Sequence, residues 1–202
     1  MLVLKDQIQK MLSVLFIGLF ITVLIITLPL GTALGDSVIA VTPVGEFPHS
    51  LEFNPSNNNV YVANRDSGTV SVIDSVTNIV IKNITVGGSP ASLKFNPFNN
   101  YTYVANSISN IISLIDSSTN MVADDVDVGS NPAALEFNPS NNHTYVTNTI
   151  SNTVSVIDSS TNMVTNNVDV ETSPIALEFN PLNNNIYVAN RDSGTVSVID
   201  SN

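Results

Sequence analysis

The stretch YVANRDSGTVSVIDS fills residues 61–75, and the same letters return at residues 187–201. Three landmarks recur with the same spacing. FNP begins at Phe53, Phe95, Phe137 and Phe179. Tyr-Val begins at Tyr61, Tyr103, Tyr145 and Tyr187. The aspartate that closes VSVID or ISLID is Asp74, Asp116, Asp158 and Asp200. Each series advances by 42 residues without an insertion, so the chain contains four copies of one unit.

Each copy has the pattern of short β-strands separated by turns. In the first copy, SLEFN alternates the apolar Leu51 and Phe53 with Glu52, and it is followed by VYVAN, TVSVID and VTNIVIKNITV. The Asn-Pro pair after the first run predicts a turn, because the residue before a proline avoids the helical region. Four strands in about 42 residues match one blade of a β-propeller. The predicted fold is therefore all-β, a propeller of four blades, with a stacked solenoid as the alternative.

The link between the second and third strands carries one further prediction. Its equivalent positions are occupied by Gly68, Asn110, Asn152 and Gly194. Glycine and asparagine are the residues that most readily adopt a positive φ. We therefore expect a left-handed residue in each of these hairpins.

The motif YVAN at residues 61–64, 103–106 and 187–190, with its variant YVTN at 145–148, is each time followed by VSVID or ISLID. In these features the chain resembles the YVTN-type β-propeller repeats of archaeal surface-layer proteins, over about residues 38–202. The resemblance implies that the FNP run is the innermost strand of each blade, YVAN the second and VSVID the third. It also implies an outer strand that leads through Val-Gly into the next blade, although Glu171 replaces that glycine in the fourth copy. Propellers of this family commonly have seven blades, whereas this chain has four repeats.

The two ends of the repeat region are complementary. Residues 37–45, SVIAVTPVG, read as an outer strand without its own blade, and the fourth copy stops after VSVID without an outer strand. A strand from residues 37–45 could complete the last blade and remove an exposed sheet edge. The sequence favours a four-bladed ring closed by this N-terminal strand. A homodimer of eight blades that exchanges these strands, and a fragment of a larger propeller, remain open.

The N-terminal part predicts export. Residues 11–35 contain no charged side chain, Lys5 and Lys10 precede them and Asp36 follows. We expect residues 1–35 to form a hydrophobic helix that is either a cleaved signal peptide or a retained membrane anchor. The two lysines on its N-terminal flank predict that residues 36–202, the propeller domain, lie outside the cell.

Composition excludes several functions. From Asp36 onward, 16 acidic residues stand against four basic ones, Arg65, Lys82, Lys94 and Arg191. Nucleic-acid binding is not expected, because phosphate binding depends on clustered lysine and arginine. The chain has no cysteine, which excludes disulfides, thiol catalysis and thiolate metal sites.

Neither a catalytic group nor a metal or other cofactor site is predicted. The two histidines, His49 and His143, stand alone, and no GxSxG nucleophile motif is present. Polar residues that recur in every copy are expected to bond turns and strand ends, since a single active site would occur once. The weak binding candidates are Arg65, Arg191 and His49, which ring closure would gather as positive charge for an anionic glycan or a neighbouring subunit.

Three Asn-x-Ser/Thr triplets are candidate glycosylation sites, at Asn83, Asn100 and Asn142. Together these features predict a non-catalytic, extracellular propeller at the cell surface, which serves as envelope structure or as a platform for adhesion and protein contact. Its expected partners are envelope proteins or glycans, with a membrane contact only through the N-terminal segment. The alternative is an exported ligand-binding or enzymatic propeller that uses its central channel.

Overall fold

The computed structural model describes residues 36–202, and Ala40–Asn202 form one compact unit. This unit consists of 15 β-strands, and every pairing between them is antiparallel. The predicted hydrophobic helix, with its signal or anchor role, falls on residues 1–35 and lies outside the described residues. Within residues 36–202, the search for a helix that is long and apolar enough to cross a membrane found none.

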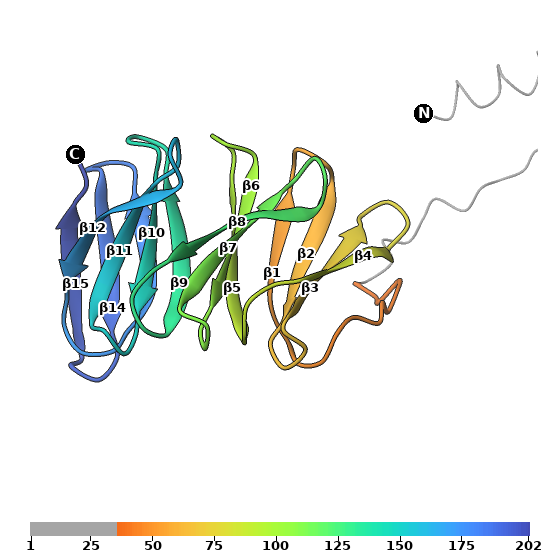
Figure 1. The fold of residues 1–202 in the computed structure, drawn as a ribbon, viewed down its shortest axis with the longest axis horizontal. Helices are drawn as coiled ribbons and strands as arrows, with labels where there is room; N and C mark the ends of the chain where they lie inside the picture. Colours follow the sequence, from red (N-terminus) through yellow and green to blue (C-terminus); the bar gives the residue numbers. More distant parts are fainter. Residues whose placement is uncertain (1–35) are drawn as a thin grey trace, which may run out of the picture. The chain divides into compact units, whose positions relative to one another are not determined.

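The strands form four sheets in the order of the chain (Figure 1). The first sheet contains β1 (Pro48–Asn54), β2 (Asn59–Asn64), β3 (Thr69–Asp74) and β4 (Ile79–Thr85). The second contains β5 (Pro90–Asn96), β6 (Tyr101–Asn106), β7 (Ile111–Asp116) and β8 (Met121–Asp127). The third contains β9 (Pro132–Asn138), β10 (His143–Asn148), β11 (Thr153–Asp158) and β12 (Met163–Asp169). The fourth has three strands, β13 (Pro174–Asn180), β14 (Asn185–Asn190) and β15 (Thr195–Asp200).

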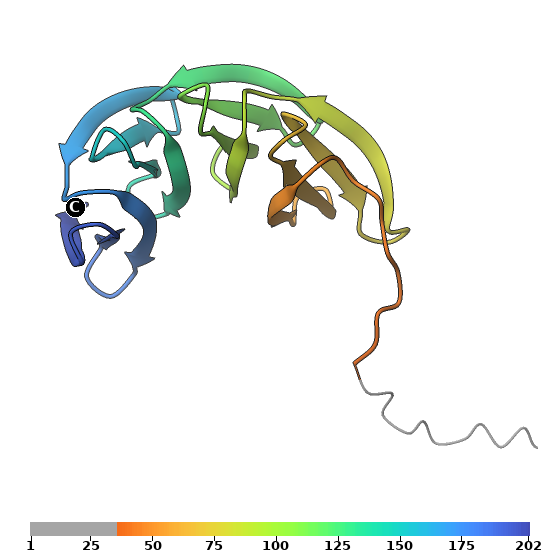
Figure 2. The same cartoon turned by 90° about the horizontal axis from the view of Figure 1, so that it is seen from below.

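The repeat prediction is confirmed at the level of strands and sheets. FNP ends the first strand of each sheet, YVAN or YVTN lies in the second, and VSVID or ISLID lies in the third. Figure 2 shows the sheets following one another along an arc, with β1, β5, β9 and β13 on its inner side and β4, β8 and β12 on its outer side. The architecture is thus all-β, repetitive and propeller-like.

The predicted closing strand at residues 37–45 is not formed in this structure. Residues 37–44 have no regular secondary structure, Val38 and Val41 are 83% and 87% exposed, and within the described residues β15 pairs only with β14. The cause is geometric. Residues 37–45 lead directly into β1, whereas β15 belongs to the sheet at the other end of the arc (Figure 2).

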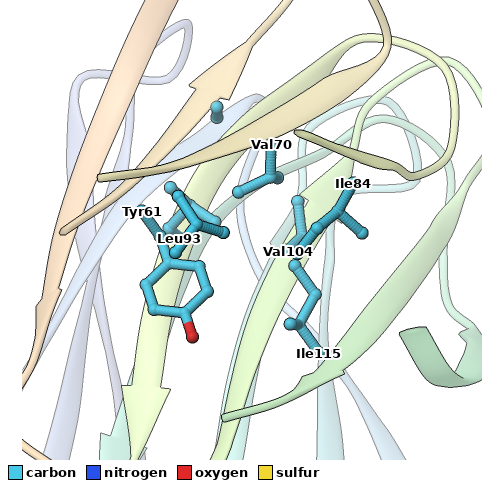
Figure 3. Packing of buried hydrophobic residues seen from close by; sticks show 8 residues of the cluster. Tyr61, Val70, Ile84, Leu93, Val104 and Ile115 are labelled. Atoms are coloured by element: carbon cyan, nitrogen blue, oxygen red, sulfur yellow. The ribbon is translucent and has the colours of Figure 1, made fainter. Parts of the chain in front are cut away.

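The hydrophobic core lies between neighbouring sheets. In the first junction, Tyr61, Val70 and Val72 of the first sheet pack against Leu93, Val104 and Ile115 of the second (Figure 3). The equivalent residues fill the second and third junctions. Fully burying one such aliphatic or aromatic side chain contributes about 1.5–3 kcal/mol. Each sheet therefore depends on its neighbours for stability.

A buried polar contact accompanies the apolar packing at each junction. The asparagine of FNP donates through Nδ2 to the serine that follows VSVID or ISLID in the next sheet. The pairs and distances are Asn54 to Ser117 at 2.6 Å, Asn96 to Ser159 at 2.7 Å, and Asn138 to Ser201 at 2.9 Å. All six residues are buried, so these bonds satisfy polar groups that water cannot reach. We call this contact the Asn–Ser bridge.

The left-handed hairpin residues are also confirmed. Gly68, Asn110, Asn152 and Gly194 have φ values of 62°, 59°, 56° and 65°. Both asparagines add a bond, because Asn110 Oδ1 accepts from the amide of Asn131 and Asn152 Oδ1 accepts from that of Ser173. The positive φ explains why only glycine or asparagine occupies these positions, and the side-chain bond is an additional role of asparagine.

Asn152→Val should unfold at a lower temperature than Asn152→Gly. Both variants lose the 2.9 Å bond to the Ser173 amide, but only valine must hold a Cβ in the left-handed region. That conformation costs about 1–2 kcal/mol for a residue with a Cβ. Thermal unfolding followed by circular dichroism makes the comparison, and equal midpoints would contradict it.

Asn96→Ala should lower the free energy of unfolding by about 1–3 kcal/mol, because it removes a buried bridge and leaves Ser159 short of a partner. Denaturant titration measures the change. Asn166→Ala is the matched control, since Asn166 is exposed on β12, and it should change stability by no more than about 0.5 kcal/mol. Equal losses in the two variants would show that the bridge contributes nothing specific.

Candidate functional site

Two of the predicted binding residues meet at the loop before β1. Phe47 has a positive φ of 53°, its ring stacks on His49 at 6.2 Å, and the Arg65 guanidinium lies 6.0 Å from the ring centre. His49 Nδ1 lies 2.9 Å from the carbonyl of Ala91, and Arg65 Nε donates to Ser89 Oγ at 3.0 Å. The result is a small aromatic and cationic cluster on an exposed loop.

Sequence reasoning missed Phe47, the residue that joins His49 to Arg65. The signal was present, because the equivalent positions in the other copies are Ser89, Asn131 and Ser173. All of these positions have positive φ, a conformation that is rare for a bulky residue such as phenylalanine. The Phe47 side chain is also 56% exposed. Strain together with exposure marks Phe47 as the unusual residue of this loop.

Arg191 does not join this cluster. It lies in the β14–β15 hairpin, where Nη2 donates to Ser173 Oγ at 3.0 Å and Nε to Asp192 Oδ1 at 2.8 Å. The hydrogen bond from Arg191 holds the pKa of Asp192 below its usual value. The predicted gathering of Arg65 with Arg191 depended on ring closure. The structure keeps the two arginines on the first and last sheets.

The inner strands of the four sheets line a hollow of about 730 Å³. Its lining repeats three residue types at 42-residue spacing: a charged residue, a phenylalanine and a proline. These residues are Glu52, Phe53, Pro55, Lys94, Phe95, Pro97, Glu136, Phe137, Pro139, Glu178, Phe179 and Pro181. Lys94 is the only basic residue among them, and it breaks a series that is otherwise glutamate. Sequence reasoning named the channel but not Lys94, which the same comparison of repeats could have found.

Three of the four charged groups that line the hollow are bonded to neighbours. Lys94 Nζ lies 2.9 Å from Glu136 Oε2, and Glu52 Oε1 accepts from the amide of Phe95 at 3.0 Å. Burial raises the pKa of Glu136, the bond from Lys94 lowers it, and the charge of Glu178 raises it again. The hollow thus offers carboxylates and one ammonium group among phenylalanine and proline side chains, a composition that suits binding of a small polar ligand.

The polar residues that recur in every copy are used in turns. Asp116 Oδ1 accepts from both the amide and the hydroxyl of Ser118, at 2.7 Å and 2.6 Å, and these bonds lower the pKa of Asp116. Asp158 makes the same contacts with Ser160. These carboxylates stabilise strand ends, as the repeat argument predicts.

The described residues were searched for metal-binding groups, and the three candidate glycosylation sites can be compared by their exposure. Within residues 36–202, no group of three or more His, Asp or Glu side chains is placed to hold a metal ion. Of the glycosylation candidates, Asn83 is exposed and its Oδ1 accepts from Ser71 Oγ at 2.7 Å. Asn100 and Asn142 are partly buried turn residues with positive φ. Asn83 is therefore the most accessible of the three.

The sheets, their order and the inner hollow define an all-β repeat protein with propeller-like architecture. No protein-family model matches the sequence, and no curated protein matches it. Solved structures do match, among them "Kuenenia stuttgartiensis Hydrazine Synthase", with a TM-score of 0.71 and 20% sequence identity. The match covers 84% of this chain and 49% of that one, so this chain spans about half of its length. At this identity the likeness concerns the fold alone.

Lys94→Met should raise the pKa of Glu136 further, because it removes the ammonium group whose bond and charge favour the ionised carboxylate. A carboxyl-detected NMR titration of Glu136 measures the shift. Lys82→Met is the control, since Lys82 Nζ donates to the carbonyl of Thr119 and not to a carboxylate. An unchanged Glu136 titration in Lys94→Met would show that the ion pair does not form in solution.

Proposed function

We propose that this chain is a non-catalytic, exported β-propeller displayed at the cell surface, where it serves as envelope structure or as a platform for adhesion and protein contact. Its proposed partners are envelope proteins or glycans. The observation that carries the proposal is the use of the recurring polar groups. The asparagine, serine and aspartate residues that recur in the copies bond turns and form the three Asn–Ser bridges.

The acidic surface and the absence of cysteine support this role. A chain with formal net charge −11 and stability from repeated sheet packing suits a protein that needs neither disulfides nor a nucleic-acid partner. The exposed Phe47, His49 and Arg65 cluster supplies an aromatic and cationic surface for an anionic glycan. Asn83 is the accessible position for a glycan attached to the protein itself.

Membership of the YVTN-type archaeal surface-layer family belongs to the same proposal, on the strength of the recurring YVAN and VSVID motifs. So does the reading of the four sheets as four propeller blades. We propose that residues 37–45 of a neighbouring copy act as the outer strand that the fourth sheet lacks, since within the described residues the outer edge of β15 is unpaired. Residues 1–35 are then the signal peptide or anchor.

The second candidate is an exported ligand-binding or enzymatic propeller that uses the inner hollow. The 730 Å³ hollow with its partly buried Glu136–Lys94 pair is the observation that favours it. A metal or chromophore that co-purifies with the protein, detected by elemental analysis and absorbance, would support this candidate over the first.

Protease treatment of intact cells tests the surface role. If the domain is displayed, mild digestion should release peptides from residues 36–202 that mass spectrometry identifies without breaking the cells. The same digestion of lysed cells is the control for total protein. Recovery of these peptides only after lysis would place the domain inside the cell and overturn the proposal.

A further inference from the structure

The two ends of the arc each expose apolar side chains whose equivalents are buried at junctions between sheets. On the fourth sheet, Val196 and Val198 are 60% and 53% exposed, whereas the equivalent Val70 and Val72 of the first sheet are fully buried. On the first sheet, Leu51 is 68% exposed, whereas the equivalent Leu93 and Leu135 of the next two sheets are 5% and 6% exposed. Exposed apolar patches of this kind mark interaction sites.

The two exposed faces are complementary halves of the junction that the molecule already makes three times. In the first junction, the face of the first sheet that carries Val70 and Val72 packs against the face of the second sheet that carries Leu93. Val196 and Val198 belong to the same face as Val70 and Val72, within the identical stretches 61–75 and 187–201. Leu51 belongs to the same face as Leu93. A sheet like the first therefore fits on the free face of the fourth.

The polar groups of the Asn–Ser bridge are also left open at both ends. Ser117, Ser159 and Ser201 are buried bridge acceptors, but the equivalent Ser75 on the first sheet is exposed. Asn180 is the equivalent donor on the fourth sheet, and among the residues that the structure describes its Nδ2 bonds to no neighbouring sheet. Asn180 and Ser75 therefore form a matching donor and acceptor.

The first and last sheets of the described residues do not pack against each other. β1 packs against β5, β5 against β9 and β9 against β13, but no comparable packing joins β1 to β13. Figure 2 shows that the opening between the first and last sheets is wider than the spacing between neighbouring sheets. The repeated junction thus has a curvature that leaves the arc open after four sheets.

We propose that the free faces are covered by a second copy of this chain, head to tail, so that the fourth sheet of each copy packs on the first sheet of the other. A rotation that brings two identical arcs end to end closes a ring with two equivalent junctions and leaves no free face. Eight sheets lie within the usual range of four to eight blades.

This arrangement also gives residues 37–45 a partner. In each copy they precede β1, which would lie beside the fourth sheet of the partner, so they can pair with the partner's β15 as its missing outer strand. The same junction brings Arg191 beside Phe47 of the partner subunit, as Arg65 lies beside Ser89 within one chain. The exposed ring of Phe47 then meets a second guanidinium group beside that of Arg65.

Solution mass tests the assembly. All three cores lie within Ala40–Asn202, so residues 36–202 retain them and can be studied without the N-terminal segment. Light scattering over a hundredfold range of concentration should give about twice the mass of one chain. A one-chain mass would overturn the proposal in favour of an open or self-closed monomer, and a mass that grows with concentration would overturn it in favour of an open-ended polymer.

Charge placed on either free face should break the dimer without unfolding it. Val196→Asp and Leu51→Asp should each reduce the mass by half at unchanged β-sheet circular dichroism. Ile150→Asp is the matched control, because Ile150 is 70% exposed in the β10–β11 hairpin, away from both faces, and it should leave the mass unchanged. Dimers that persist in both face variants would overturn the proposed interface.

A disulfide placed across the predicted bridge identifies which ends meet, and the chain has no cysteine to interfere. Asn180→Cys with Ser75→Cys should give a covalent dimer under oxidising conditions. Asn54→Cys with Ser117→Cys is the positive control, because these residues bridge within one chain at 2.6 Å and their bond should leave the chain monomeric on a denaturing gel. An internal 75–180 bond, or no bond while the control forms, would overturn the proposal.

Discussion

The packing of one sheet against the next is the interaction on which the rest of the structure depends. A sheet of three or four strands has two faces, and it can bury them only against another part of the protein. At each junction a face with a tyrosine and two aliphatic residues, such as Tyr61, Val70 and Val72, meets a face with a leucine. The buried Asn–Ser bridge fixes the register of the same contact. Repetition of this one junction produces the arc, its inner hollow and its two free ends.

This constraint separates structural polar residues from candidate functional ones. Every junction needs its asparagine and serine, and every turn after the third strand uses its aspartate, so these groups recur with the period of the fold. Residues that break the period are under no such requirement. Phe47 and Lys94 are the two clearest cases, since one holds a strained loop conformation and the other pairs with a partly buried glutamate. The likeness to hydrazine synthase concerns the common fold and assigns neither residue a role.

The candidate site was only partly predictable. The sequence pointed to His49 and Arg65 because both depart from the repeat, but their meeting through the ring of Phe47 required the loop conformation. Arg191 occupies the same position as Arg65 within its copy, yet its Nε donates to Asp192, whereas Arg65 Nε donates to Ser89 of the next sheet. Equivalent sequence positions therefore have different partners, because among the described residues no sheet lies beside Arg191 as the second sheet lies beside Arg65. The charged lining of the inner hollow follows from sheets arranged around a common side, which no single repeat encodes.

The sequence alone determined the period, the strands and the left-handed hairpin residues, since these depend on local alternation and on the conformational freedom of Gly68 and Asn152. It also predicted that residues 37–45 form an outer strand, whereas residues 37–44 have no regular secondary structure. Only the tertiary structure decided that this segment does not pair with β15 of its own chain. The physical reason is that ring closure depends on the curvature set by side-chain packing at each junction. The angle between neighbouring sheets adds up over the four sheets, and the 42-residue period does not determine it.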